Sequence, residues 1–170
     1  MKGFTNGQRQ NSQCFTLKEN GSWTRGPNLT NSIGAGAAIS TNEKILIFGG
    51  PSQIEDKSAI HEINSNRSTE IGHLPFKFDR GCAINQNGSV HIIGGWQNFH
   101  MSNHTWISPI ENFDWKRGQD LIQGRIDHAC AFIPKWDIGI VTGGYFYAAI
   151  ALSSTELLRN GRFSTGWYWS

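Results

Sequence analysis

The chain has 170 residues, of which 15 are Lys or Arg and 13 are Asp or Glu, so its formal net charge is +2. This balanced charge, without a basic run interleaved with aromatic residues, gives no electrostatic footprint for nucleic-acid binding. No segment reaches the roughly 18 apolar residues that a membrane-spanning helix needs, so we expect neither a nucleic-acid partner nor a membrane span.

The first 30 residues contain two predicted strands. Residues 13–17 read as a short strand, and a second strand opens with the pattern W-x-R-G-x-x-L at 23–29. The same pattern returns at 115–121, 92 residues later. In the second copy, Trp115 lies 20 residues after the glycine doublet at 94–95. The same distance before Trp23 leads to residues 2–3, which therefore hold the place of a doublet. We therefore expect residues 1–30 to be the second half of a repeat.

Residues 31–76 contain the first complete set of predicted strands. The first strand is rich in Ala and Gly, and the second is an apolar run that ends in the doublet Gly49-Gly50. Short apolar segments separated by turn residues are typical of an all-β fold. We expect strands at 35–39, 45–48 and 59–63, and a fourth near 69–70.

Two further sets, in 77–122 and 123–166, repeat this order. Their second strands end in doublets at 94–95 and 143–144, and Asn87-Gly88 is a strong hairpin signal because both residues tolerate positive φ. We expect strands at 81–84, 90–93, 105–107 and around Trp115, and then at 129–133, 138–142, 154–158 and near 163–164.

The doublets recur at spacings of 45 and 49 residues, which indicates a repeat architecture. The doublet strands, the two tryptophans, the stretch Ser154–Leu158, and Arg80 and Arg125 before inner strands together resemble the kelch repeat. The resemblance implies a kelch-type β-propeller with structural repeat residues Gly49, Gly50, Gly94, Gly95, Gly143, Gly144, Trp23 and Trp115.

The expected domain is a single incomplete propeller over 1–170, with a partial blade in 1–30 and blades in 31–76, 77–122 and 123–166. Propellers use 4–8 blades, so we expect a fragment of a larger propeller. The alternative is self-association that closes the propeller. The first strand of each unit is rich in small residues (Ala, Gly and Cys), which fit the crowded position nearest the central axis of a propeller.

The resemblance implies a non-catalytic scaffold that binds a protein partner, because function usually lies in loops carried by a rigid framework. Aromatic residues and arginine dominate binding hot spots. The predicted partner-binding residues lie in the loops after the doublets and between the units: Arg80, Arg125, Trp96, Phe99, Tyr145 and Tyr147.

The alternative is a fragment of a kelch-type propeller enzyme, such as a sugar epimerase or a galactose-oxidase-like oxidase, whose site lies in missing blades. A copper oxidase of that kind needs two tyrosines and two histidines around one metal. Here Tyr145, Tyr147 and Tyr168 cluster at the end of the chain without a matching histidine pair. Asp79 and Asp127 hold equivalent repeat positions, which favours a structural role. We therefore expect no catalytic residue, cofactor or metal.

Three cysteines are present, and Cys82 and Cys130 hold equivalent places in adjacent units. We expect two buried thiols, because a bridge needs Cα atoms within about 7 Å and neighbouring inner strands should splay apart. Asn-x-Ser/Thr sequons exceed the number expected by chance, which favours an extracellular or cell-surface glycoprotein over a cytoplasmic one. The candidate acceptors are Asn20, Asn28, Asn66, Asn87 and Asn103.

Overall fold

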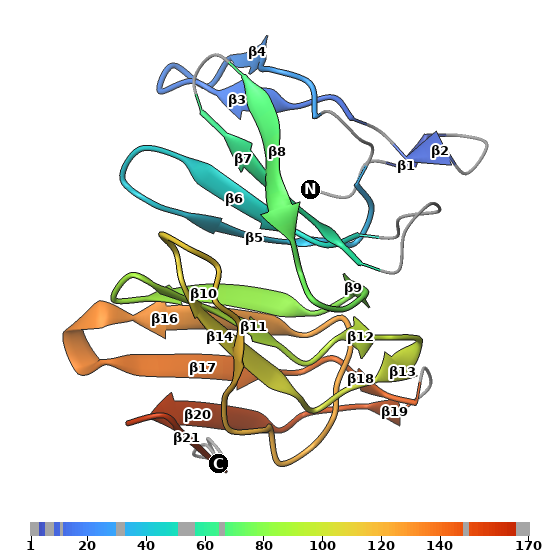
Figure 1. Cartoon of the computed structure of the whole chain (residues 1–170), viewed down its shortest axis with the longest axis vertical. Coiled ribbons are helices and arrows are strands. Elements are labelled where there is room, and N and C mark those ends of the chain that lie inside the picture. Colours follow the sequence, from blue (N-terminus) through green and yellow to red (C-terminus); the bar gives the residue numbers. More distant parts are fainter. Residues whose placement is uncertain are drawn as a thin grey trace.

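The computed structural model describes residues 4–5, 9–10, 12–29, 33–50, 57–64, 67–147 and 150–165. Nearly all of its regular structure is antiparallel β-sheet, and one short 3₁₀ helix, η1 (Pro134–Trp136), connects two strands. Figure 1 shows the sheets following one another along the long axis of the molecule.

Three four-stranded sheets form the body of the molecule, each with its strands in chain order. They lie within the three ranges expected for complete blades, so the all-β fold is confirmed. The first blade consists of β5 (Ala37–Ser40), β6 (Ile45–Phe48), β7 (Ala59–Ile63) and β8 (Ser68–His73). The middle blade consists of β10 (Cys82–Gln86), β11 (Ser89–Ile93), β14 (Thr105–Pro109) and β15 (Lys116–Arg117). The last blade consists of β16 (Ala129–Ile133), β17 (Ile138–Thr142), β20 (Thr155–Arg159) and β21 (Arg162–Thr165).

A two-stranded sheet, β3 (Phe15–Leu17) with β4 (Trp23–Arg25), precedes the first blade, and we call it the partial blade. A second pair, β1 (Phe4–Thr5) with β2 (Arg9–Gln10), comes before it. The two copies of the W-x-R-G-x-x-L pattern make the same backbone hydrogen bonds. Gly26 N donates to Cys14 O and Gly118 N to Thr105 O, both at 2.9 Å, while the two leucines of the pattern bond to Ser12 and Asn103. The partial blade therefore contains the third and fourth strands of a repeat.

The first strands of the three complete blades lie next to one another, β10 being in contact with both β5 and β16. Small side chains allow this approach. The strand pairing makes Ala38, Ala83 and Cys130 equivalent, because they pair with Ile47, Ile92 and Val141, each two residues before a doublet. Ala83 packs against the buried cluster shared by the first and middle blades, and Cys130 packs against the cluster shared by the middle and last blades. This position therefore faces the preceding blade.

The glycine doublets join the blades through backbone atoms. The first glycine of every doublet donates its N–H within its own blade, to Ala59 O, His104 O or Ser154 O. The second donates to the next blade: Gly50 N bonds to Phe78 O at 2.9 Å and Gly95 N to Arg125 O at 2.8 Å. A Cβ atom added at Gly49 would collide with Phe78 O, so no side chain fits there.

Two clusters of buried side chains fill the spaces between blades. One joins the first and middle blades around Phe48, Phe76 and Ile92, and Trp115 packs edge-on against Phe48 with ring centroids 6.1 Å apart. The other joins the middle and last blades around Ile93 and Leu158. Each cluster draws on two sheets, so a blade in this chain is stabilised mainly by its neighbours.

Cys82 and Cys130 form a disulfide between β10 and β16, with their Cα atoms 6.0 Å apart. The prediction of two separate buried thiols is therefore wrong. So is the prediction that they are equivalent: Cys82 pairs with the residue next to its doublet, and Cys130 with the residue before that. The bridge forms because adjacent inner strands stay in contact at this height instead of splaying apart.

The predicted equivalence of Asp79 and Asp127 is also wrong, by the same shift of one residue. Arg80, not Asp79, is equivalent to Asp127: both have positive φ, of 55° and 53°. Arg80 N donates to Ala35 O at 2.8 Å, and Asp127 N donates to Arg80 O at 2.7 Å. This chain of hydrogen bonds runs from blade to blade.

Candidate functional site

The loops that follow the second and third doublets fold into small hairpins at one end of the blades. In the middle blade β12 (Trp96–Gln97) pairs with β13 (His100–Met101) and with β9 (Phe78–Asp79), and in the last blade β18 (Tyr145–Phe146) pairs with β19 (Ile150–Ala151). Figure 1 shows these five strands on the same side of the molecule. We call the surface that they form the connector face.

The connector face exposes large aromatic side chains. Phe99, at the tip of the β12–β13 hairpin, is 66% exposed, and Tyr147, after β18, is 70% exposed. The Lys77 ammonium lies 4.9 Å from the centroid of the Phe99 ring. The N–H of Tyr147 donates to the sulfur of Met101 at 3.3 Å, so the two hairpins are in contact. The aromatic side chains thus belong to one continuous surface.

Trp96 and Tyr145 lie nearer to the sheets. Trp96 pairs with Asp79 and Met101 and is partly buried, whereas Tyr145 is 42% exposed and pairs with Ile126 across an isolated bridge. Trp96 therefore offers less accessible surface than Phe99, and part of its role is to hold β12 between β9 and β13.

Arg80 forms an ion pair with Asp127 at the edge of the connector face. Its Nε donates to Asp127 Oδ2 at 3.2 Å, its Nη2 donates to the same oxygen, and its side chain remains 37% exposed. The nearby Asp79 carboxyl has its pKa raised by burial, an effect that the Arg80 charge opposes. The pair joins the middle and last blades and leaves part of the guanidinium accessible.

The prediction that Arg125 contacts a partner is wrong, because its side chain is fully buried. Its guanidinium donates to Glu156 Oε1 at 2.7 Å, to Ser154 Oγ, and to the carbonyl oxygens of Gly143 and Ser154. Glu156 also accepts from the N–H of Ile122 at 2.7 Å. A buried ion pair needs such additional hydrogen bonds to offset the loss of solvation, and Arg125 therefore has a structural role inside the last blade.

The position of Glu156 in its strand indicates that its carboxylate is buried. Glu156 and Leu158 are two residues apart on β20 and so lie on the same face of the strand, and Leu158 is buried in the second core cluster. A carboxylate on the buried face of a strand requires a cationic partner, and Arg125 is that partner.

Two histidines in the blade interior have lowered pKa values. Burial lowers the pKa of His91, in β11, to about 4. Burial, with a smaller contribution from the nearby Arg125 charge, lowers that of His128 to about 4. Both side chains are therefore neutral near pH 7. In the part of the chain that the structure describes, no group of three or more His, Cys, Asp or Glu side chains could hold a metal ion.

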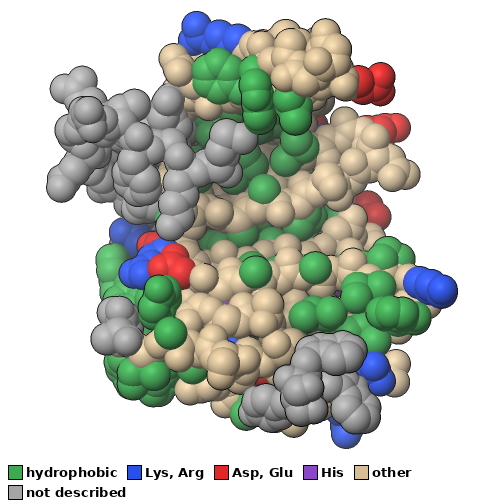
Figure 2. Space-filling model, turned by 180° about the vertical axis from the view of Figure 1, so that it is seen from behind, with side chains coloured by type: hydrophobic (Ala, Val, Ile, Leu, Met, Phe, Trp, Pro, Cys, Tyr) green, Lys and Arg blue, Asp and Glu red, His purple; other side chains and the backbone are tan. Residues whose placement is uncertain are grey.

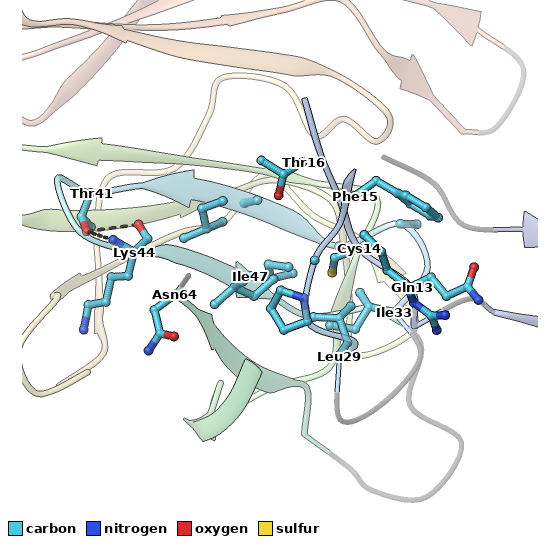
Figure 3. Close-up of a pocket in the computed structure, with 18 of the residues that line it drawn as sticks. Gln13, Cys14, Phe15, Thr16, Leu29, Ile33, Thr41, Lys44, Ile47 and Asn64 are labelled. Atoms are coloured by element: carbon cyan, nitrogen blue, oxygen red, sulfur yellow. Dashed lines mark hydrogen bonds between the residues drawn. The ribbon is translucent and has the colours of Figure 1, made fainter. Parts of the chain in front are cut away.

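A cavity of about 840 Å³ lies between the partial blade and the first blade. Figure 3 shows Cys14 and Phe15 on one side, and Thr41 and Lys44 on the other. In Figure 2 hydrophobic side chains are visible in the hollow below the upper end of the molecule. The cavity extends to residues at the entry of the inner strands: Ala35, Gly36, Ala38, Arg80, Gly81, Asp127 and His128.

The sequons differ in accessibility. Asn20, Asn28 and Asn87 are exposed, while Asn66 lies outside the described residues. The Oδ1 atom of Asn20 accepts from Ser22 N and Ser22 Oγ. Asn103 is partly buried and its Nδ2 donates to Leu121 O at 3.1 Å, so it has a structural role in the folded chain. No helix among the described residues is long and apolar enough to cross a membrane.

No family model matches the sequence. The chain is similar to alpha-scruin of Limulus polyphemus, a kelch-repeat protein, with 29% identity over 148 residues that cover 79% of this chain and 15% of alpha-scruin. It is also similar to the solved structure of YjhT, with a TM-score of 0.72 and 14% identity, over 92% of this chain and 52% of that chain. The chain thus spans about half the length of YjhT, and its fold is that of a β-propeller.

Proposed function

We propose that this chain is part of a kelch-type propeller that binds a protein partner through the connector face and carries out no catalysis. The exposure of Phe99 and Tyr147, on hairpins from adjacent blades that contact each other, carries this proposal. Large aromatic side chains on rigid elements are the residues that supply most binding energy in protein interfaces. The similarity to alpha-scruin over 79% of the chain supports the kelch assignment.

Arg80 and Tyr145 complete the proposed surface. The guanidinium of Arg80 is partly exposed and can pair with an acidic group of a partner in addition to Asp127. Tyr145 places a further aromatic ring on the same face. A partner with an acidic residue close to an apolar segment fits this combination of groups.

Site-specific photo-crosslinking tests the proposal. A photoreactive phenylalanine is placed at Phe99, at Tyr147 or, as a control, at Trp136. Trp136 is also an exposed aromatic residue (62%), but it lies in η1, at the opposite end of the last blade. We expect one protein from the native source to crosslink at the first two positions and not at Trp136. Equal recovery from all three positions would contradict the proposal, as would stoichiometric copper in the purified chain.

We further propose an extracellular or cell-surface location. The Cys82–Cys130 disulfide supports it, because disulfides persist in oxidising compartments, and so do the exposed Asn20, Asn28 and Asn87. Site mapping after expression through a secretory pathway should show glycans at exposed sequons and none at Asn103. Secretion without any glycan, or a reduced Cys82–Cys130 pair in the native protein, would contradict this location.

A further inference from the structure

We propose that Met101 is an oxidation site, and that its conversion to methionine sulfoxide by a peroxide separates the outer parts of the two connector hairpins. The modification would act as a redox switch on the connector face. Its biological meaning rests on the proposed function, because the surface that it alters is the proposed binding surface. The structural step itself needs no partner and can be measured without one.

The bases of the two hairpins are joined through main-chain hydrogen bonds. Ser102, which follows β13, accepts from Arg125 N at 3.3 Å. Ile126 and Tyr145, at the start of β18, exchange two N–H···O bonds of 3.1 and 2.9 Å. A main-chain path therefore links the bases, and no change to a side chain removes it.

The outer parts of the hairpins are joined through the sulfur of Met101. Met101 Sδ accepts from the N–H of Tyr147 at 3.3 Å. Among the described residues, this is the one hydrogen bond that links the outer part of the β12–β13 hairpin to Tyr147, after β18. Met101 is partly exposed, so a small solute can approach its side chain.

Tyr147 depends on this contact because its backbone is strained. Its φ of 45° lies in the left-handed region, which a bulky residue rarely adopts without compensation. The ring of Tyr147 packs edge-on against Phe146, which belongs to the same hairpin. The hydrogen bond to Met101 is thus the contact that ties this strained residue to the middle blade.

Oxidation changes the chemistry of the Met101 sulfur. Hydrogen peroxide transfers one oxygen atom to the thioether: its O–O bond breaks, a sulfur–oxygen bond forms, the sulfur loses two electrons, and the peroxide leaves as water. The product is polar, whereas the thioether is apolar and a weak acceptor. Sulfur and nitrogen are already in contact, so an oxygen between them would push Tyr147 away. In any other orientation the sulfur carries partial positive charge and no longer accepts from the N–H.

Peptide mapping and amide hydrogen exchange test the proposal. The chain carries Cys14→Ala, because Cys14 is a free thiol that also reacts with peroxide. Met1 is the other methionine of the sequence, so each can be followed separately. We expect Met101 to gain one oxygen in the folded chain. The Tyr147 amide should then exchange about threefold faster or more, as the loss of a weak hydrogen bond requires. The Ile126 amide, at the base, should not change.

A leucine at position 101 provides the matched control. Met101→Leu keeps an apolar side chain but has no sulfur, so its Tyr147 amide should exchange at the faster rate both before and after peroxide. A methionine sulfoxide reductase should return the oxidised chain to the slower rate. The proposal would be overturned if Met101 stayed unoxidised in the folded chain, if oxidation left the Tyr147 exchange rate unchanged, or if the leucine variant exchanged as slowly as the reduced chain.

Photo-crosslinking from position 99 separates this inference from the proposed function. We expect oxidation of Met101 to reduce the yield of the crosslinked partner several-fold, and an unchanged yield would contradict the switch. If no partner crosslinks even before oxidation, the proposed function fails instead. The exchange rate of the Tyr147 amide then decides by itself whether Met101 oxidation separates the hairpins.

Discussion

The partial blade and the middle blade carry the same W-x-R-G-x-x-L pattern in different surroundings. Trp115 packs edge-on against Phe48 of the first blade and stacks on Phe113, with ring centroids 6.2 Å apart. Trp23, its counterpart in the partial blade, is 55% exposed. Both copies nevertheless make the same hydrogen bonds. The pattern therefore determines the local backbone geometry, whereas the neighbouring blade determines how much the tryptophan contributes to stability.

The largest expected difference between the two regions is the loss of stability at acidic pH. The first histidine of the chain is His61, so residues 1–60 contain none, whereas His91 and His128 lie in and beside the middle blade with pKa values of about 4. The unfolded chain takes up these protons near pH 6.5 and the folded chain does not. Stability is thus complete above pH 6.5 and falls as the pH drops to about 4, by up to about 3 kcal/mol for each histidine.

Urea denaturation between pH 7.5 and 4 measures this loss. We expect His91→Leu to reduce the slope of stability against pH, and Trp23→Ala, in the partial blade, which contains no histidine, to leave it unchanged. An unchanged slope for His91→Leu would contradict the assignment.

Removing the disulfide should have the next largest effect. The bridge closes a 48-residue separation between the middle and last blades, so replacing both cysteines with alanine should lower the free energy of unfolding by about 2–4 kcal/mol. Cys14→Ala, in the partial blade, is the control and should change it by less than about 0.5 kcal/mol. Denaturant unfolding of the two variants in parallel compares them. Equal stability would show that the bridge is absent from the native protein.

Alanine substitutions at Gly49 and at Gly143 test whether another blade packs against each of these two positions. Gly49 and Gly143 both have positive φ, of 74° and 67°. At Gly49 an added Cβ would collide with Phe78 O. At Gly143, among the described residues, it would come within 4 Å only of Leu152 O, at 3.8 Å. Gly143→Ala should cost about 1 kcal/mol for the backbone alone. Gly49→Ala should cost about 2–4 kcal/mol because overpacking is added. Thermal unfolding of both variants measures the difference, and equal losses would mean that a further blade covers Gly143.

The tryptophans themselves give the smallest difference. Trp115→Ala should destabilise the chain by about 2 kcal/mol or more, because it empties a packed aromatic cluster. Trp23→Ala should change stability by less than about 1 kcal/mol, since over half of the side chain is already exposed. Chemical denaturation of both variants provides the comparison. A large effect of Trp23→Ala would indicate that a partner or a second copy covers the partial blade in solution.

The sequence predicted the strands of the complete blades because apolar runs and doublets recur with a regular spacing. It did not predict the connector hairpins, since strands of two residues, such as β12 and β13, are too short to show alternation. It placed the cysteines and aspartates one residue out of register, because the interval between repeats varies and only pairing across the sheet fixes the equivalence. The burial of Arg125 depended on Glu156, 31 residues away, and on a hydrogen-bond network that no local pattern shows.

The hydrogen bonds from the second glycines of the first two doublets, Gly50 and Gly95, have a consequence for how such chains change over time. The acceptor is a main-chain carbonyl, and that carbonyl belongs to Phe78 at one junction and to Arg125 at the next. An aromatic and a cationic residue thus serve equally well, because neither side chain takes part in the bond. This bond therefore survives a change of side chain at the acceptor position when a unit is duplicated or replaced, whereas the buried clusters between blades still have to match.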